Sequence, residues 1–384
     1  MEFDHALPIT IGIIWLVILI GFVLRRLNQP YVVSYLLAGI LLGPSGIGLI
    51  TDQDMLYRMG EFGVMLLLFF IGMEMDLPSL LSRWRISFIP TFAQIFFSFL
   101  IIIWLNRWLE WPLERCLLIA FVISLSSTAV IIKILEEWNE LHTRVGQTVV
   151  GILIAQDILV VPMLIILSVV GGGDVEEETL VLQIIALIGL VGLIIFLVKN
   201  QRIRLPFTRH LRNDHELQVF VALGTCFGMA FLTGAVGLST ALGAFIGGVI
   251  MAAARETNWI KSKLESIRVI FVALFFLSVG LLLNLNFIVE NGWVVISLVL
   301  VVLIVNSFIA SLFLRVMGLP LRESIYAGSL LAQIGEFSFV LIASGLALRI
   351  VSNYAYQLSI AVIALTLIIS PLWIAATKRI IGWR

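Results

Sequence analysis

The sequence predicts an all-α, polytopic membrane protein, and its composition, its long apolar stretches and the placement of its charges each indicate this class. Of the 384 residues, 61% are hydrophobic and only 12% are charged, and the mean hydropathy is +1.11. Soluble domains carry about twice that share of charged residues. Apolar stretches of about 20 residues, the length at which a helix crosses a bilayer core, recur along the chain. We therefore expect a multi-pass protein of the cell membrane (inner or plasma), surrounded by membrane lipids.

Thirteen transmembrane helices are expected. They are the segments 6–24, 31–50, 61–76, 86–108, 114–135, 145–170, 179–199, 216–233, 238–254, 268–285, 292–315, 323–348 and 354–377. The third is short, and several contain glycine or polar residues. The first is not expected to be a cleaved signal peptide, because its leader "MEFDH" is acidic and two arginines follow the apolar run instead of preceding it.

The loop charges predict an N-terminus outside and a C-terminus in the cytoplasm. In this orientation all but four of the 24 basic residues lie on the inner side. The acidic loop "GGGDVEEETL" falls outside. This distribution follows the positive-inside rule. The net charge of zero therefore hides a distribution in which basic residues gather on the inner side, and no nucleic-acid partner is expected.

Neither cysteine, Cys116 or Cys226, suggests a disulfide or a metal site.

The chain contains a weak internal repeat. "LLAGILLG" at 36–43 resembles "ALGAFIGG" at 241–248, and "LLFFIG" at 67–72 resembles "ALFFLSVG" at 273–280. The order and the spacing continue, so that "SLSSTA" falls on "LLAQIG" and Pro162 lies near the position equivalent to Pro371.

These matches equate spans one to six with spans eight to thirteen. The predicted single transmembrane domain, 1–384, therefore comprises repeat one (6–170), a connector helix (179–199) and repeat two (216–377). Because the shift of seven spans is odd, the second copy enters the membrane inverted, as in many secondary transporters. The alternative is a chance likeness between helices rich in leucine, glycine and alanine.

The fifth and twelfth spans, which the repeat equates, are both interrupted by polar residues near their middle. Irregular backbone at membrane depth is tolerated only where protein or a cavity surrounds it, and matching interruptions in two repeats point to a binding site. We expect crossed, discontinuous helices. Their supporting residues would be Ser126, Gln333, Gly335, Glu336 and Ser338. The alternative is that these residues only mediate contacts between unbroken helices, as we expect of Gln94 and Asn306.

A carboxylate lies in the middle of the sixth span, in "GILIAQDILVVP". A charge there costs at least about 2.5–3.5 kcal/mol, so Asp157 is a candidate functional residue. Such a group can hold a proton or a metal cation in turn. Gln156, Ser127 and Thr128 offer further oxygen ligands of the kind that hard cations prefer. Because Gln156 is neutral, we expect one proton to exchange for one monovalent cation, without net charge movement. The alternative is a buried polar pair that tethers two helices.

Glu336 is the second acid well inside a span. It has three possible roles: a second titrating group, a partner for the broken twelfth span, or an anchor for a basic residue. We favour the two structural roles.

Six ordered motifs resemble the cation:proton antiporter-2 family. They are "LAGILLGPSGIGLI", "FFIGMEMDL", "SLSSTAVIIKIL", "AQDILVVP", "GLSTALGAFIGGVI" and "GEFSFVL". The Gln-Asp pair is most similar to the Kef-type potassium efflux branch. The resemblance implies a thirteen-span inverted-repeat fold, a homodimer with a dimerisation domain and a mobile core, and Asp157 as the cation- and proton-binding carboxylate beside Gln156.

Two departures from the family pattern qualify this resemblance. Kef-type proteins normally continue into a cytoplasmic nucleotide-binding regulatory domain, whereas this chain ends at "KRIIGWR", so regulation is not carried over. It is a truncated chain or a short relative. Electrogenic relatives often carry a lysine in the tenth span, and "VALFFLSVGLLLN" has none, which agrees with electroneutral exchange.

The sequence therefore predicts a potassium/proton antiporter that works by alternating access, with K⁺ or Na⁺ at Asp157 as transported ion and without a cofactor. The alternatives are a sodium/proton antiporter of the same fold, a ligand-gated potassium efflux channel, or a sensor that binds an ion without transporting it. An enzyme is not expected. An intramembrane aspartyl protease needs two catalytic aspartates, and a second intramembrane aspartate is absent from the sequence.

Overall fold

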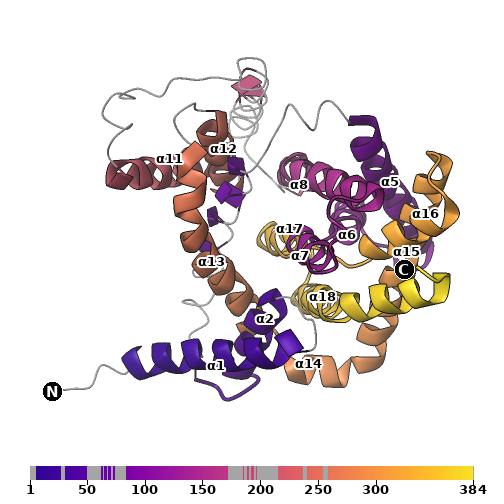
Figure 1. Ribbon diagram of the computed structural model, residues 1–384, viewed down its shortest axis with the longest axis horizontal. Coiled ribbons are helices and arrows are strands. Elements are labelled where there is room, and N and C mark those ends of the chain that lie inside the picture. Colours follow the sequence, from indigo (N-terminus) through magenta and orange to yellow (C-terminus); the bar gives the residue numbers. More distant parts are fainter. Residues whose placement is uncertain are drawn as a thin grey trace. The chain divides into compact units, whose positions relative to one another are not determined.

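A computed structural model of the chain describes residues 6–26, 31–49, 84–171, 215–236, 240–253 and 258–383, with single positions within 62–73 and 185–196. The regular structure of these residues is helical, with no β-strand among them (Figure 1). The all-α prediction is confirmed.

The chain forms two compact units, which are described separately. Unit 1 comprises Met1–Leu56, Arg83–Met163 and Phe276–Arg384, and unit 2 comprises Tyr57–Ser82 and Leu164–Phe275. Unit 1 holds α1 (Ala6–Arg26), α2 (Tyr31–Leu42), α5 (Trp84–Leu109), α6 (Leu113–Ser124), α7 (Thr128–Glu137), most of α8 (Arg144–Val170), α14 (Leu285–Glu290), α15 (Gly292–Val316), α16 (Leu321–Leu330), α17 (Phe337–Ala347) and α18 (Asn353–Ile381). Unit 2 holds α11 (His215–Ala235), α12 (Thr240–Ala253) and most of α13 (Asn258–Leu281).

Several predicted spans match single helices. Among the described residues, five helices are long and apolar enough to cross a membrane, namely α5, α8, α11, α15 and α18. The spans predicted at 114–135 and 323–348 are each divided into two shorter helices, α6 with α7 and α16 with α17. Most of the third span and of the connector at 179–199 lies outside the described residues.

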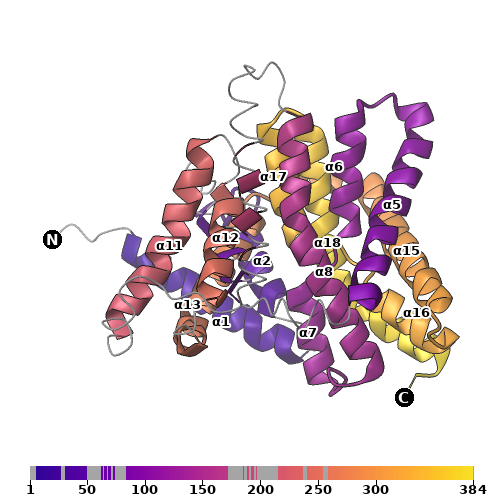
Figure 2. The same ribbon diagram turned by 90° about the horizontal axis from the view of Figure 1, so that it is seen from above.

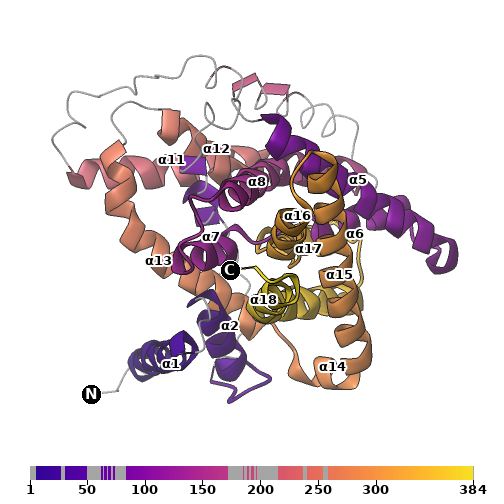
Figure 3. The same cartoon turned by 45° about the vertical axis from the view of Figure 1, so that its right-hand side comes forward.

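In unit 1, α5 and α6 lie side by side, and α6 also contacts α17 (Figure 2). Helix α15 packs against α16 and α18, and α18 contacts both α16 and α17 (Figure 3). The broken helices therefore lie among long helices that bury their polar segments. Along α5, large side chains such as Phe92, Phe96 and Trp104 are more than half exposed. Apolar faces of this kind suit contact with lipid rather than with water.

Glycines allow two close helix crossings, one in each unit. In unit 1, α2 crosses the end of α13, and a Cβ on Gly39 would lie 2.1 Å from the Leu277 carbonyl oxygen. In unit 2, a Cβ on Gly248 of α12 would lie 2.0 Å from the Phe69 carbonyl oxygen. Backbones approach this closely only where side chains are absent, as is common between membrane helices.

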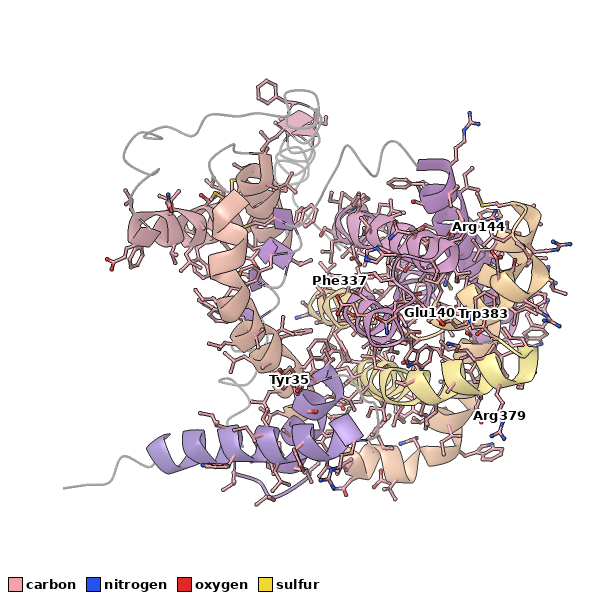
Figure 4. All side chains as sticks on the ribbon, in the orientation of Figure 1. Tyr35, Glu140, Arg144, Phe337, Arg379 and Trp383 are labelled. Atoms are coloured by element: carbon pink, nitrogen blue, oxygen red, sulfur yellow. The ribbon has the colours of Figure 1, made fainter. Side chains whose placement is uncertain are left out.

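An ion pair ties the end of α18 to the loop that follows α7. Lys378 Nζ donates to Glu140 Oε1 at 2.7 Å, and the Tyr326 hydroxyl donates to the other oxygen of the same carboxylate. The Lys378 ammonium also lies 4.3 Å from the centre of the Trp138 ring. Figure 4 shows Glu140 and Trp383 close together at this end of unit 1. The C-terminal end of α18 is thus connected to both broken helices.

Candidate functional site

The first helix break consists of three residues, Leu125 to Ser127. Helix α6 ends at Ser124, and Leu125 has an extended backbone with φ −91° and ψ 129°. Ser127 is also extended, and its hydroxyl accepts a hydrogen bond from the Val130 N–H at 3.3 Å. Serine is a favoured residue at a helix N-terminus, because its oxygen satisfies an N–H that has no partner within the helix. The serine cluster therefore both interrupts the span and restarts it as α7.

The second break consists of residues 331–336, between α16 and α17. The Ile334 N–H donates to Thr366 Oγ1 of α18 at 3.2 Å. Asn306 of α15 donates from one nitrogen to the Ala332 carbonyl at 3.1 Å and to the Ile123 carbonyl of α6 at 2.7 Å. A single amide group thus holds backbone next to both breaks.

The two breaks cross in direct contact. The Gly335 N–H donates to the Leu125 carbonyl at 2.7 Å, and Ser126 Oγ donates to the Leu331 carbonyl at 2.8 Å. A Cβ on Gly335 would lie 2.6 Å from both the carbonyl carbon and the oxygen of Ser126. Only glycine therefore permits this approach. The expectation of crossed, discontinuous helices agrees with the geometry of the described residues.

Gln156 of α8 completes the backbone pairing at the first break. Its Oε1 accepts from the Ser126 N–H at 2.9 Å, and its Nε2 donates to the Ser124 carbonyl at 3.1 Å. The Gln94 oxygen of α5 lies 3.5 Å from the same Nε2. Gln156 is fully buried. A buried N–H or carbonyl without a partner is costly, so the amide of Gln156 replaces the hydrogen bonds that the helix loses where it breaks.

Asp157, the next residue, faces the start of α7. The Thr128 hydroxyl lies 2.9 Å from one carboxylate oxygen of Asp157 and 3.1 Å from the other. Asp157 is 5% exposed. Because Thr128 is the first residue of α7, the carboxylate lies near a helix N-terminus, where the peptide dipoles favour negative charge. The Asp157 oxygens and the Thr128 hydroxyl are the hard oxygen donors of the site.

Glu336 connects the second break to the first. Ser127 Oγ donates to Glu336 Oε2 at 2.6 Å, and Glu336 is 3% exposed. Ser127 and Thr128 are consecutive, so Glu336 and Asp157 contact neighbouring hydroxyls. Two buried acids therefore share the crossing, one on each side of the Ser127–Thr128 step.

Most of the residues predicted for the site meet at the crossing. Asp157, Gln156, Ser126, Ser127, Thr128, Gly335 and Glu336 make the contacts given above, and Ser338 Oγ donates to the Val122 carbonyl at 2.7 Å. Gln333 is also buried in the second break, but neither atom of its amide has a hydrogen-bond partner. Its predicted supporting role is therefore not visible as a hydrogen bond.

Sequence reasoning missed two contributors to the crossing. Asn306 was expected to make an interhelical hydrogen bond, which it does, but its position between both breaks was not foreseen. Thr366 was missed altogether. Its hydroxyl in the middle of the apolar span 354–377 was a weak signal, because the same span contains other hydroxyl side chains. Among the described residues, no group of three or more His, Cys, Asp or Glu side chains is placed to hold a metal ion.

Comparison with known proteins places this geometry in a family. The family model described as "Sodium/hydrogen exchanger, transmembrane" matches residues 12–378. The chain is 37% identical over 362 residues to the "Iron transporter MagA" of Paramagnetospirillum magneticum, covering 94% of this chain and 83% of that protein. It is 30% identical to the "K(+) efflux antiporter 5" of Arabidopsis thaliana, covering 92% of this chain and 63% of the antiporter, so the chain spans less than two thirds of that relative.

A solved structure is similar over the whole chain. The sodium proton antiporter MjNhaP1 from Methanocaldococcus jannaschii, determined at pH 8, matches with a TM-score of 0.69 and 16% identity, covering 98% of this chain and 100% of that one. At this identity the likeness bears on the fold alone. With a family model that extends over almost the entire chain and K⁺ efflux antiporters among its relatives, the chain belongs to the sodium/hydrogen exchanger family of cation/proton antiporters, which are transporters and not enzymes.

Proposed function

We propose that this protein exchanges one monovalent cation, K⁺ in preference to Na⁺, for one proton, by alternating access at Asp157. The observation that carries the proposal is a buried carboxylate at the N-terminus of a broken helix, with a threonine hydroxyl against both of its oxygens. A carboxylate in this position binds a proton or a cation, but not both at once. An ion that leaves to one side and a proton that enters from the other then exchange without a further energy source.

The inverted-repeat architecture is part of this proposal, and paired contacts support it. The repeat equates span two with span nine and span three with span ten. Span two crosses span ten at Gly39, and span nine crosses span three at Gly248. The two breaks also cross each other. Matching crossings of this kind are what two inverted copies of one fold would each contain. We retain thirteen spans for this arrangement.

Electroneutral exchange follows if Asp157 alone titrates during the cycle. Gln156 carries no charge, and its amide is engaged with the first break. In this proposal Gln156 serves mainly to fix the backbone beside the ion, although its oxygen retains a second lone pair for a ligand. Glu336 accepts from Ser127 and holds the second break against the first.

The choice of cation rests on the named relatives. One is named a K⁺ efflux antiporter, one a sodium proton antiporter and one an iron transporter. The oxygen donors around Asp157 suit alkali cations, whereas iron sites in proteins commonly include imidazole or thiolate ligands. A proteoliposome assay with K⁺, Na⁺ and Fe²⁺ in turn separates these possibilities. Proton release driven only by Fe²⁺ would contradict the proposed substrate.

Asp157→Asn tests the central assignment. The substitution preserves shape but removes the titratable group, so we expect cation-induced proton release in proteoliposomes to fall to the background of empty vesicles. Glu290→Gln is the matched control, because Glu290 is an exposed acid at the end of α14. It should exchange at the wild-type rate. Exchange retained in Asp157→Asn would remove Asp157 from the mechanism.

The surroundings that we propose follow the sequence and the family. The protein would lie in the inner or plasma membrane as a homodimer, with the N-terminus outside and the C-terminus in the cytoplasm, where a nucleotide-binding regulatory domain would follow in longer relatives. Cross-linking in the native membrane tests the dimer. Reporter fusions after residues 26 and 384 test the orientation: both positions should report the cytoplasmic side.

A further inference from the structure

One face of α5 carries four buried polar residues. Ser87, Thr91, Gln94 and Ser98 are each at most 3% exposed, and their spacing of four, three and four residues places them on one side of the helix. The neighbouring Phe92 is 55% exposed on the other side. A polar face turned inward and an apolar face turned outward are typical of a membrane helix whose polar side has a function. We call these four residues the α5 polar stripe.

Two groups of the α5 polar stripe have no partner. Ser98 Oγ and Gln94 Nε2 are buried without a hydrogen bond, and the Gln94 oxygen makes only the long 3.5 Å contact to Gln156 Nε2. Polar groups in protein interiors are nearly always paired, with protein or with ordered water. Pure helix-to-helix adhesion would have paired them. Ordered water is the remaining kind of partner for both groups.

The α5 polar stripe follows α8 from its N-terminal end to the ion site. Near its start, Gly151 of α8 faces Ser87, where a Cβ would lie 2.7 Å from the serine hydroxyl. Glycine in a helix interior is unfavourable, and here it keeps the space beside that hydroxyl open. Arg85 and Arg144, within the first turns of α5 and α8, are exposed. Further along the stripe, Gln94 contacts Gln156, which precedes Asp157, and Ser98 lies one turn beyond Gln94.

We propose that Gln94 and Ser98 bind ordered water, and that the hydrated α5 polar stripe carries protons between the N-terminal ends of α5 and α8 and the Asp157 site. The inference rests on the proposed function, since it assigns a path to the proton that Asp157 exchanges. Hydroxyl and amide groups bind water well. A metal cation in the α5 polar stripe would lack a counter-charge, because none of the four residues is acidic.

The pair Gln94→Met and Ser98→Ala tests this path. Each substitution keeps the approximate shape and removes the water-binding group. In proteoliposomes at saturating K⁺ we expect the double variant to lower the maximal proton flux by about tenfold, the factor that about 1.4 kcal/mol of barrier produces. The K⁺ concentration for half-maximal flux should change by less than about twofold, because Asp157 and Thr128 are untouched. Ser168→Ala is the control, since the Ser168 hydroxyl donates to its own helix at Leu164.

Unchanged maximal flux in the double variant would overturn the inference. If the half-maximal K⁺ concentration also rose, Gln94 would belong to the cation site instead.

The thermal stability of Ser98→Ala gives a second readout. A dry interface gains or is unaffected when an unpaired hydroxyl is removed, whereas a hydrated one loses a water ligand, so we expect a lower Tm. An unchanged or raised Tm contradicts the proposal. If Asp157→Asn still releases protons when the cation is added, the proposed function itself is refuted. If Asp157→Asn abolishes proton release but the double variant exchanges at the wild-type rate, only the water path is refuted.

Discussion

The two helix breaks are built alike but equipped differently. Each lies between two short helices, and each backbone is held by a side chain from a long neighbouring helix. The first break has three residues and the second has six. The spacing between equivalent positions is 206 residues at the ends of α6 and α16, Ser124 and Leu330, and 209 at the starts of α7 and α17, Thr128 and Phe337. The difference in spacing therefore lies in the second break, which has three more residues than the first.

The same spacing of 209 also relates residues beside the two breaks. It places Asp157 of α8 opposite Thr366 of α18, and Ser127 opposite Glu336. Thr366 satisfies the backbone N–H of Ile334, whereas Asp157 leaves the backbone to Gln156 and faces Thr128. At matching places beside the two breaks, one side chain thus supports the backbone and the other is ionisable. The comparison teaches that two breaks of similar build can carry different chemistry, as the proposed single ion site requires.

The largest effect is expected from Gly335→Ala, which disrupts the crossing that both breaks share. The added Cβ would meet backbone atoms of Ser126 at 2.6 Å, and backbone cannot move aside without parting the breaks. Overpacking of this kind costs about 1–3 kcal/mol, and we expect the upper end of that range together with loss of cation-induced proton release. Thermal unfolding in detergent and proteoliposome flux measure the two effects.

Gly345→Ala is the control for this prediction. Gly345 lies on α17, the helix that follows the second break, and its Cβ would meet the Leu118 side chain of α6, which can change rotamer. We expect a smaller loss of stability and retained exchange. If both substitutions behave alike, the close approach of the two breaks is not what makes Gly335 necessary.

Thr128→Val should have the next largest effect, and it acts only on the first break. The valine keeps the volume but removes the hydroxyl that lies against both oxygens of Asp157. A hydrogen bond to a charged group contributes about 1.5–3 kcal/mol, so we expect the half-maximal cation concentration to rise by at least about tenfold in the flux assay. Thr128→Ser keeps the hydroxyl and should stay near the wild-type value. Equal losses in both variants would point to packing instead.

The sequence predicted the two breaks and the acid because a bilayer makes polar residues conspicuous. Ser127, Gln156 and Asp157 stand out in apolar spans, where each has an energetic cost that requires a purpose. The partners were harder to foresee. Helices α15 and α18 are apolar on nearly every face, so the periodicity of apolar residues does not show which face turns inward. Asn306 and Thr366 act through backbone groups of distant breaks, and only the fold brings these together. For the same reason, the sequence suggested Gln156 as an ion ligand before its backbone partners were known.

The smallest effect on transport is expected from Thr366→Val, the same substitution at the second break. It leaves the buried Ile334 N–H without its acceptor, which costs about 1–3 kcal/mol of stability. Because no ion-binding group depends on Thr366, the half-maximal cation concentration should remain within about twofold of wild type, while the Tm falls. Measured beside Thr128→Val, this variant separates the roles of the two copies. If the cation affinity falls equally in Thr128→Val and Thr366→Val, the second break also shapes the ion site. Its three extra residues would then not separate its role from that of the first break.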